Sequence, residues 1–165
     1  MSKAAAIEEA PFNYTGYGTA GSEYERTKAL SRTEIARLIR ADIKAAIRAK
    51  ELPKLKVSVR TRSYSGGGAI DVSVTGVPEG FKICNREHVA FEVENPHACF
   101  PRDLPHYTDE AREVIAKLEA IRTKYGFSDC DGMIDYFHVR YYGGTDIDWQ
   151  LTREDRERTK TELGR

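Results

Sequence analysis

Four isoleucines recur at every fourth position in one segment of the chain, at Ile35, Ile39, Ile43 and Ile47. Apolar side chains with this period are typical of the buried face of an α-helix. The preceding Ser31-Arg-Thr-Glu34 has the form of a capping box, and Pro53 disfavours helix because it lacks a backbone N–H. The pattern predicts a long helix over residues 32–50, and its isoleucine face must be covered by other elements of the fold.

The other side of this helix is basic. Each helical residue advances by about 100°, so four cations fall away from the isoleucines: Arg37, Arg40, Lys44 and Arg48. The segment 26–62 holds twelve basic and three acidic residues, although the whole chain has 26 of each and no net charge. The basic segment 26–62 is therefore balanced by an acidic remainder of the chain. We expect the basic segment to contact phosphates or an acidic surface.

Residues 55–75 predict two strands joined by a tight turn. Apolar and polar side chains alternate from Leu55 to Arg62 and again from Ile70 to Thr75, which indicates a hairpin with one apolar and one polar face. Three glycines, 66–68, lie between the two runs. They could approach a phosphate closely, but the lysine and the helix that follow a P-loop are missing, so we interpret them as the turn.

The rest of the chain adds fewer elements. Residues 76–107, rich in proline and glycine, predict a long connection with one edge strand or a short helix near Val89–Val93. Thr108 is a suitable N-cap for a second long helix, and a polar loop then leads to a strand over residues 135–142. Three alternating apolar residues predict a further short strand: Ile147, Trp149 and Leu151.

These elements predict an α+β fold, with an antiparallel sheet of three to five strands and two main helices packed on one face. A length of 165 residues fits one domain. We expect a flexible N-terminal tail over residues 1–21, a single domain over 22–151 and a charged C-terminal tail over 152–165, which could also form a solvated helix.

The polar face of the hairpin is a second candidate surface. It carries Arg60 and Arg62 near Tyr64, and the strand over 135–142 would extend it, if both joined one sheet, with Tyr136, His138, Arg140 and Tyr142. Cations interleaved with aromatic rings suit single-stranded DNA or RNA, because phosphates meet the cations while bases stack on the rings. The alternative is an ordinary solvated face on which Asp71 pairs with a neighbouring arginine.

A weaker set of candidates could bind zinc: Cys84, His88, His97 and Cys99. Their spacing is not that of a standard zinc finger, and the alternative is a set of unrelated buried cysteines and surface histidines. We predict no cofactor and no enzymatic activity, since no catalytic motif stands out. The odd number of cysteines favours reduced thiols in the cytoplasm, and no apolar run is long enough to cross a membrane.

Three segments together resemble the large polyvalent protein-associated domain, type 29: Ser31–Lys44, Leu55–Val72 and Tyr125–Tyr142. The resemblance implies an origin in a mobile genetic element, a phage or a plasmid, and a role against host defence. It brings no catalytic residues.

We therefore predict a non-enzymatic interaction module that binds nucleic acid or a host protein that handles nucleic acid. One alternative is an inhibitor that binds a host defence protein through the acidic half of the chain. Another is a small zinc-binding or enzymatic domain centred on Cys84, His88, His97, Cys99 or His138.

Overall fold

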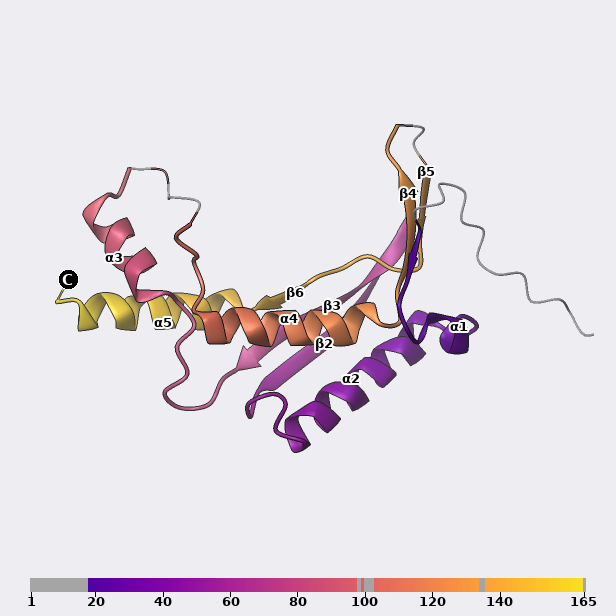
Figure 1. Cartoon of the computed structure of the whole chain (residues 1–165), viewed down its shortest axis with the longest axis horizontal. Coiled ribbons are helices and arrows are strands. Elements are labelled where there is room, and N and C mark those ends of the chain that lie inside the picture. Colours follow the sequence, from indigo (N-terminus) through magenta and orange to yellow (C-terminus); the bar gives the residue numbers. More distant parts are fainter. Residues whose placement is uncertain (1–17, 98, 100–102, 134–135, 165) are drawn as a thin grey trace, which may run out of the picture.

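The computed structural model describes residues 18–97, 99, 103–133 and 136–164. Within these ranges the chain forms the predicted α+β fold, with five helices and two sheets of three strands each (Figure 1). None of the helices in these ranges is both long enough and apolar enough to pass through a membrane.

Helix α2, Arg32–Arg48, forms where the isoleucine pattern predicts it. The Ser31 hydroxyl accepts a hydrogen bond from the Glu34 N–H, and the Glu34 carboxylate accepts one from the Ser31 N–H, so the capping box is confirmed. Lys50 follows the helix with a left-handed backbone, at φ 61°. Three of the four isoleucines are fully or almost fully buried: Ile35, Ile39 and Ile43.

Strands β2, Lys56–Tyr64, and β3, Gly67–Gly76, form the predicted antiparallel hairpin. Tyr64 pairs with Gly67, which leaves a loop of two residues, Ser65 and Gly66. Strand β6, Thr145–Ile147, pairs in parallel with the other side of β3, so this sheet is mixed rather than purely antiparallel. In the order β2-β3-β6, β2 is an outer strand.

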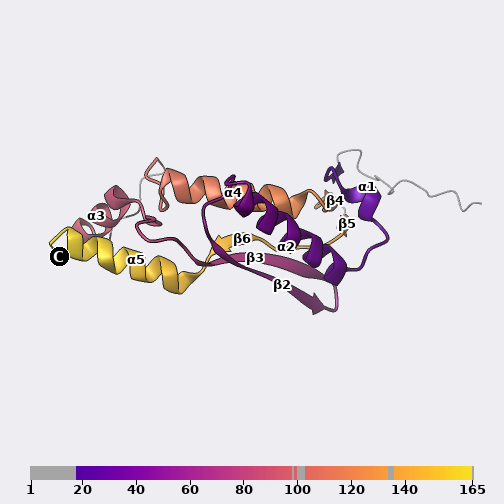
Figure 2. The same ribbon diagram turned by 90° about the horizontal axis from the view of Figure 1, so that it is seen from below.

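The main core lies between this sheet and two long helices. Helix α2 contacts β2, and helix α4, Asp109–Thr123, contacts α2, β3 and β6 (Figure 2). Thr108 caps α4, as predicted, by accepting a hydrogen bond from the Ala111 N–H at 3.1 Å. The buried side chains of the two helices join those of β3 in one cluster, which includes Val114, Leu118, Ile70, Val72 and Val74.

Most of the predicted strand over residues 135–142 lies in a different sheet from the hairpin, and residue 135 is outside the described residues. Strand β5 (Tyr136–Val139) pairs with β4 (Phe127–Asp131), and β4 pairs with β1 (Thr19–Ala20). The last residue, Tyr142, instead bonds to β3, donating its N–H to the Gly68 carbonyl and accepting from the Ile70 N–H, both at 2.9 Å. The sequence indicated a polar loop for 127–131, because the alternation of apolar and polar residues there is weak. This segment instead forms β4, which precedes β5 in the chain and pairs with it antiparallel, as consecutive strands often do. The prediction of one sheet was therefore wrong.

Two predictions at the chain ends also need correction. Residues 1–17 of the expected N-terminal tail lie outside the described residues, but Thr19–Ala20 form β1, and the Gly21 N–H donates to the Gly126 carbonyl at 2.8 Å. The short strand expected to include Trp149 and Leu151 ends at Ile147. Helix α5, Trp149–Glu162, follows it and contains most of the expected C-terminal tail.

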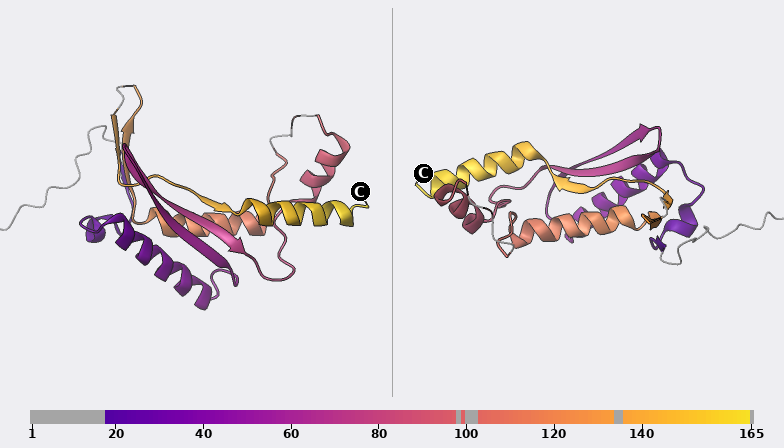
Figure 3. Two further views of the ribbon diagram at one scale, coloured as in Figure 1. Left: turned by 180° about the vertical axis from the view of Figure 1, so that it is seen from behind. Right: turned by 90° about the horizontal axis from the view of Figure 1, so that it is seen from above.

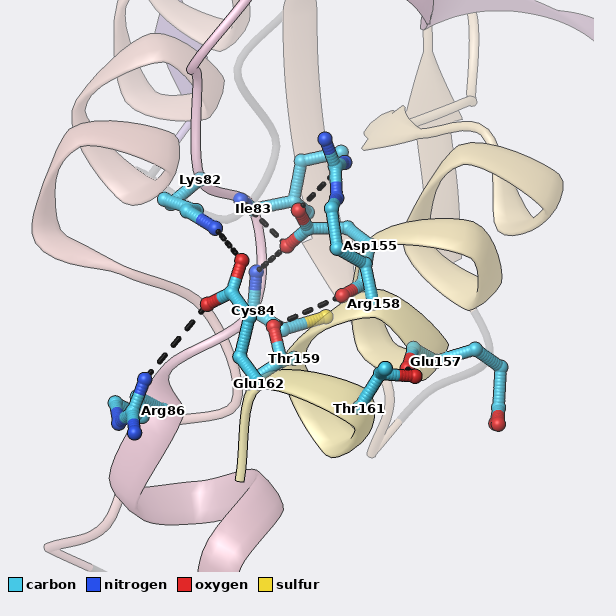
Figure 4. A network of polar contacts seen from close by, with 10 residues as sticks. All are labelled: Lys82, Ile83, Cys84, Arg86, Asp155, Glu157, Arg158, Thr159, Thr161 and Glu162. Carbon is cyan, nitrogen blue, oxygen red and sulfur yellow. Dashed lines mark hydrogen bonds and ion pairs between the residues drawn. The ribbon is translucent and has the colours of Figure 1, made fainter. Parts of the chain in front are cut away.

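Helix α5 lies beside α3, Arg86–Glu94, at the end of the molecule opposite to β4 and β5 (Figure 3). A buried carboxylate holds it there: Asp155, 1 % exposed, accepts hydrogen bonds from the N–H groups of Ile83 at 2.9 Å and Cys84 at 2.8 Å (Figure 4). Arg158 also binds Asp155. Hydrogen bonds to buried peptide groups explain why such a charged helix is anchored rather than a free tail.

Candidate functional site

The four predicted cations of α2 are exposed on the outer side of the helix. Arg37, Lys44 and Arg48 make no ion pair within the described part of the chain. Arg40 differs from them, because its guanidinium donates a hydrogen bond to the backbone carbonyl of Val59 in β2. Arg40 therefore joins the helix to the outer strand of the sheet.

The run of cations without ion pairs continues beyond α2 into β2. We call it the basic strip; it comprises Arg37, Arg40, Lys44, Arg48, Lys50, Lys54, Lys56 and Arg60. They are all of the lysines and arginines between positions 37 and 60. Within the described residues none of them has an ion-pair partner. Most described cations elsewhere do pair with acids, so the strip concentrates the uncompensated positive charge.

Acidic residues near the strip have partners of their own. Asp42 in α2 binds the Lys124 ammonium at 2.7 Å and accepts a hydrogen bond from the Tyr125 hydroxyl at 2.5 Å. Burial and the bond to Asp42 raise the pKa of Tyr125 well above its usual range. Glu34 is held by Ser31 at the start of the helix, and that contact lowers the pKa of Glu34. Asp42 and Glu34 therefore neutralise little of the strip, and Glu51, exposed between Lys50 and Lys54, is the one acid within it whose carboxylate has no ion-pair partner among the described residues.

The polar face of the hairpin has mixed charge. Arg62 binds Asp71 through two contacts, Nε to Oδ2 at 2.6 Å and Nη2 to Oδ1 at 3.0 Å, and this lowers the pKa of Asp71. A groove of about 680 Å³ lies on this face, and its lining includes Arg60, Asp146 and Asp148. The pairing of Asp71 with an arginine is confirmed, and Arg62 contributes little free charge.

Arg140 is a structural residue rather than an exposed one. Its guanidinium donates to the Tyr125 carbonyl at 2.7 Å and to the Thr27 hydroxyl at 3.0 Å, and it lies 5.1 Å from the centre of the Tyr24 ring. Burial lowers the pKa of Arg140. It ties helix α1, Tyr24–Thr27, to the second sheet and is not available to a phosphate.

The other candidates from residues 136–142 are divided by the fold. Tyr136 lies in β5, and His138 is exposed on the same strand with its ring 5.1 Å from that of Phe127. Both belong to the second sheet and do not extend the polar face of the hairpin. Tyr142 lies beyond β5, and its ring centre is 6.4 Å from that of Tyr64. These two tyrosines, 41 % and 47 % exposed, form an aromatic pair at the hairpin tip.

The zinc candidates do not converge. Cys84 is buried, its thiol faces the Thr152 carbonyl at 3.4 Å, and burial raises its pKa to about 11. His88 contacts the ring of His106, whereas His97 and Cys99 are exposed. Within the described residues no three histidine, cysteine or acidic side chains come close enough to hold a metal ion.

The glycine triplet has two structural tasks. Gly67 takes a positive φ of 139° directly after the loop. Gly68 makes room for Arg32, because a Cβ at residue 68 would lie 2.1 Å from the Arg32 Cζ atom. The Arg32 guanidinium, seated there, donates to the Arg62 carbonyl at 3.0 Å and to the Ser63 hydroxyl at 2.9 Å. The glycines thus form the turn and bind α2 to the hairpin.

Sequence reasoning missed part of the strip. Lys50 and Lys54 were not singled out, although the excess of eight basic over two acidic residues from 37 to 60 was a usable signal. The roles of Asp155 and Trp149 were also missed, since nothing in a charged segment marks one acid as buried or one tryptophan as the wall of a cavity.

Comparisons of the chain with protein-family models, with curated proteins and with solved structures found no match. The resemblance to the large polyvalent protein-associated domain stays a prediction.

Proposed function

We propose that this chain is a non-enzymatic module that binds nucleic acid through the basic strip. The observation that carries the proposal is the concentration of eight cations, none with an ion-pair partner among the described residues, on α2, β2 and the segment that joins them. Phosphate backbones attract such a surface because binding releases the counterions condensed on the nucleic acid. The mobile-element setting and the inhibition of a host protein remain predictions from the sequence.

The geometry of the strip suits a strand of phosphates. Residues 37 to 48 of a helix extend over roughly 16 Å, which is long enough to meet several phosphates of one strand. Strand β2 continues the strip with Lys56 and Arg60 and ends at Tyr64. The exposed pair of Tyr64 and Tyr142 offers rings on which unpaired bases can stack, so we propose that single strands bind more tightly than duplexes.

The test is fluorescence anisotropy with labelled single-stranded DNA, single-stranded RNA and duplex DNA at several salt concentrations. The strip variant is Arg37→Glu/Lys44→Glu/Arg48→Glu, which leaves the Arg40 contact with Val59 intact. The matched control is Arg26→Glu/Arg86→Glu/Arg112→Glu, which reverses three exposed cations on α1, α3 and α4 and changes the net charge equally.

We expect the strip variant to lose at least about tenfold in affinity and its salt slope to fall by about 2 to 3, since each phosphate contact contributes about 0.7 on a single strand and about 0.9 on B-form DNA. The control should bind within about twofold of the natural protein, the residual change reflecting long-range charge alone. Circular dichroism checks that both variants fold. Failure of all three nucleic acids to bind at low salt, or equal loss in both variants, would overturn the proposal.

A further inference from the structure

A second cavity lies away from the basic strip, between α3, α5 and the end of β6. It has a volume of about 680 Å³, within the range of about 300–1,000 Å³ that is usual for small-molecule sites. Its lining combines an aromatic wall, cations, imidazoles and two acids, Glu92 and Asp146. None of its lining residues belongs to the strip, so its chemistry needs a separate explanation.

One wall of the cavity is a face of α5. Trp149 and Arg153 both line it, and their four-residue spacing places them on one side of the helix. Trp149 is 64 % exposed, which is unusual for the largest apolar side chain. Arg153 is exposed and makes no ion pair with the described residues, so a flat ring and a free cation stand one helical turn apart.

The remaining cation of this wall already has a partner. Arg156 binds Glu92 of α3 through two contacts, one of them Nε to Oε2 at 2.8 Å. This ion pair closes the cavity between the two helices and leaves Arg153 as its available positive charge. One available arginine matches a single phosphate group better than a chain of two or three.

The opposite side of the cavity carries polar groups. His88 is buried and touches His106, with ring centres 4.8 Å apart, and His106 in turn touches Tyr107. Burial lowers the pKa of both histidines, and a neutral imidazole has one hydrogen-bond donor and one acceptor. Asp146, exposed at the edge of the cavity, adds a carboxylate of the kind that accepts hydrogen bonds from ribose hydroxyls.

We propose that this cavity binds a mononucleotide group, with the base stacked on Trp149 and the phosphate on Arg153. A flat ring for the base, one cation for the phosphate and hydrogen-bonding groups for base and sugar are what such a ligand needs. The group can come from a free nucleoside monophosphate or from the phosphorylated end of a single strand. The site does not depend on the basic strip.

Trp149 is the only tryptophan in the chain, so the natural protein carries its own reporter at the cavity. The experiment follows tryptophan fluorescence and, independently, calorimetric heat during titration with AMP, GMP, CMP and UMP. The matching nucleosides, which lack the phosphate, and 5′-phosphorylated trinucleotides form two further arms. Saturable binding of the monophosphates indicates the free ligand, and much tighter binding of the trinucleotides indicates a strand end.

Two variants test the contacts. Trp149→Ala and Arg153→Ala should each weaken monophosphate binding by about tenfold, as the loss of one stacking or one ionic contact predicts. Binding to Trp149→Ala is measured by calorimetry, because this variant lacks the fluorescent reporter. Arg153→Ala should also remove the preference for monophosphates over nucleosides. Arg112→Ala, an exposed arginine of α4 outside the cavity, should bind like the natural protein.

The inference is overturned if no monophosphate or phosphorylated trinucleotide gives a fluorescence change or heat. It is also overturned if folded Trp149→Ala and Arg153→Ala proteins bind as well as the control. The strip variant Arg37→Glu/Lys44→Glu/Arg48→Glu should retain monophosphate binding, so a failure of this inference is distinguishable from a failure of the proposed function.

Discussion

Arg62 and Asp71 bind each other across the β2–β3 hairpin, although the residue directly opposite Asp71 in the register is Arg60. The diagonal pair leaves Arg60 without an ion pair among the described residues. Two arginines that look equivalent in the sequence therefore differ in the charge that they offer to a partner.

Asp71→Asn should strengthen nucleic-acid binding. The substitution removes a carboxylate and frees Arg62, so we expect severalfold tighter binding at low salt and a salt slope larger by about 1. Anisotropy titrations at several salt concentrations measure both. Asp148→Asn changes the net charge equally in the same groove without freeing an arginine, and an equal gain in that control would show that general charge, not Arg62, is responsible.

Asp155→Ala should destabilise the protein. It leaves the buried N–H groups of Ile83 and Cys84 without their acceptor, and each lost partner costs about 1–3 kcal/mol. Asp155→Asn should lower the free energy of unfolding by less, because the amide keeps one oxygen that can accept a hydrogen bond. Urea unfolding gives the free energies, and the exposed neighbour in Glu154→Ala should change them by less than about 0.5 kcal/mol. Equal stability of Asp155→Ala and Glu154→Ala would contradict the anchoring role of Asp155.

Three glycine-to-alanine substitutions should rank in a fixed order. At Gly143 the φ of 121° is strained for alanine, and the new Cβ would lie 2.1 Å from the Ile70 carbonyl oxygen, so we expect a loss above about 3 kcal/mol. At Gly68 the Arg32 guanidinium can move away, which costs its hydrogen bonds, about 1 kcal/mol. At Gly66 no atom lies within 4 Å, and the change should be near zero. Thermal unfolding of the three variants tests the ranking, which a stable Gly143→Ala would refute.

Stability should fall in alkaline solution through Cys84. Burial raises its pKa from 9.0 to about 11, so the unfolded chain loses this proton first as the pH rises. The stability that the protonated Cys84 thiol contributes is fully present below pH 9, decreases between about pH 9 and 11, and is lost above that range. Tyr141, whose pKa burial raises to about 12, acts in the same direction at higher pH. Urea midpoints of the natural protein and of Cys84→Ala should diverge less at pH 11 than at pH 8; a constant difference would contradict the shift.

The sequence predicted the elements whose signals are local. The capping box at Ser31, the isoleucine period and the alternation on both sides of the glycines each depend on neighbouring residues, and they gave α2 and the hairpin nearly in full. The N-cap at Thr108 placed α4 in the same way.

Pairing between distant segments could not be predicted. The polar segment Phe127–Asp131 carries little alternation, so its pairing with β5 and β1 depends on contacts that no local pattern records. Helix α5 was not predicted to begin at Trp149, because Ile147, Trp149 and Leu151 alternate with polar residues as in a strand. The residue that anchors the helix, the buried Asp155, has no sequence signal that distinguishes it from the exposed acids around it. The basic side of α2 was predicted from the sequence. The contacts that occupy Arg62 and Arg140 could not be predicted, because their partners, such as Asp71 and the Tyr125 carbonyl, come close only in the folded chain.

The hydrogen bond from Arg40 to the Val59 carbonyl has a consequence for solubility. β2 is a border strand, and the unpaired peptide groups of such a strand invite another chain to extend the sheet. Arg40 occupies one of these acceptors, and its charge repels a second copy approaching by the same edge. We therefore expect Arg40 to disfavour self-assembly through this edge, and a ligand that drew its guanidinium away would leave the Val59 carbonyl without its donor.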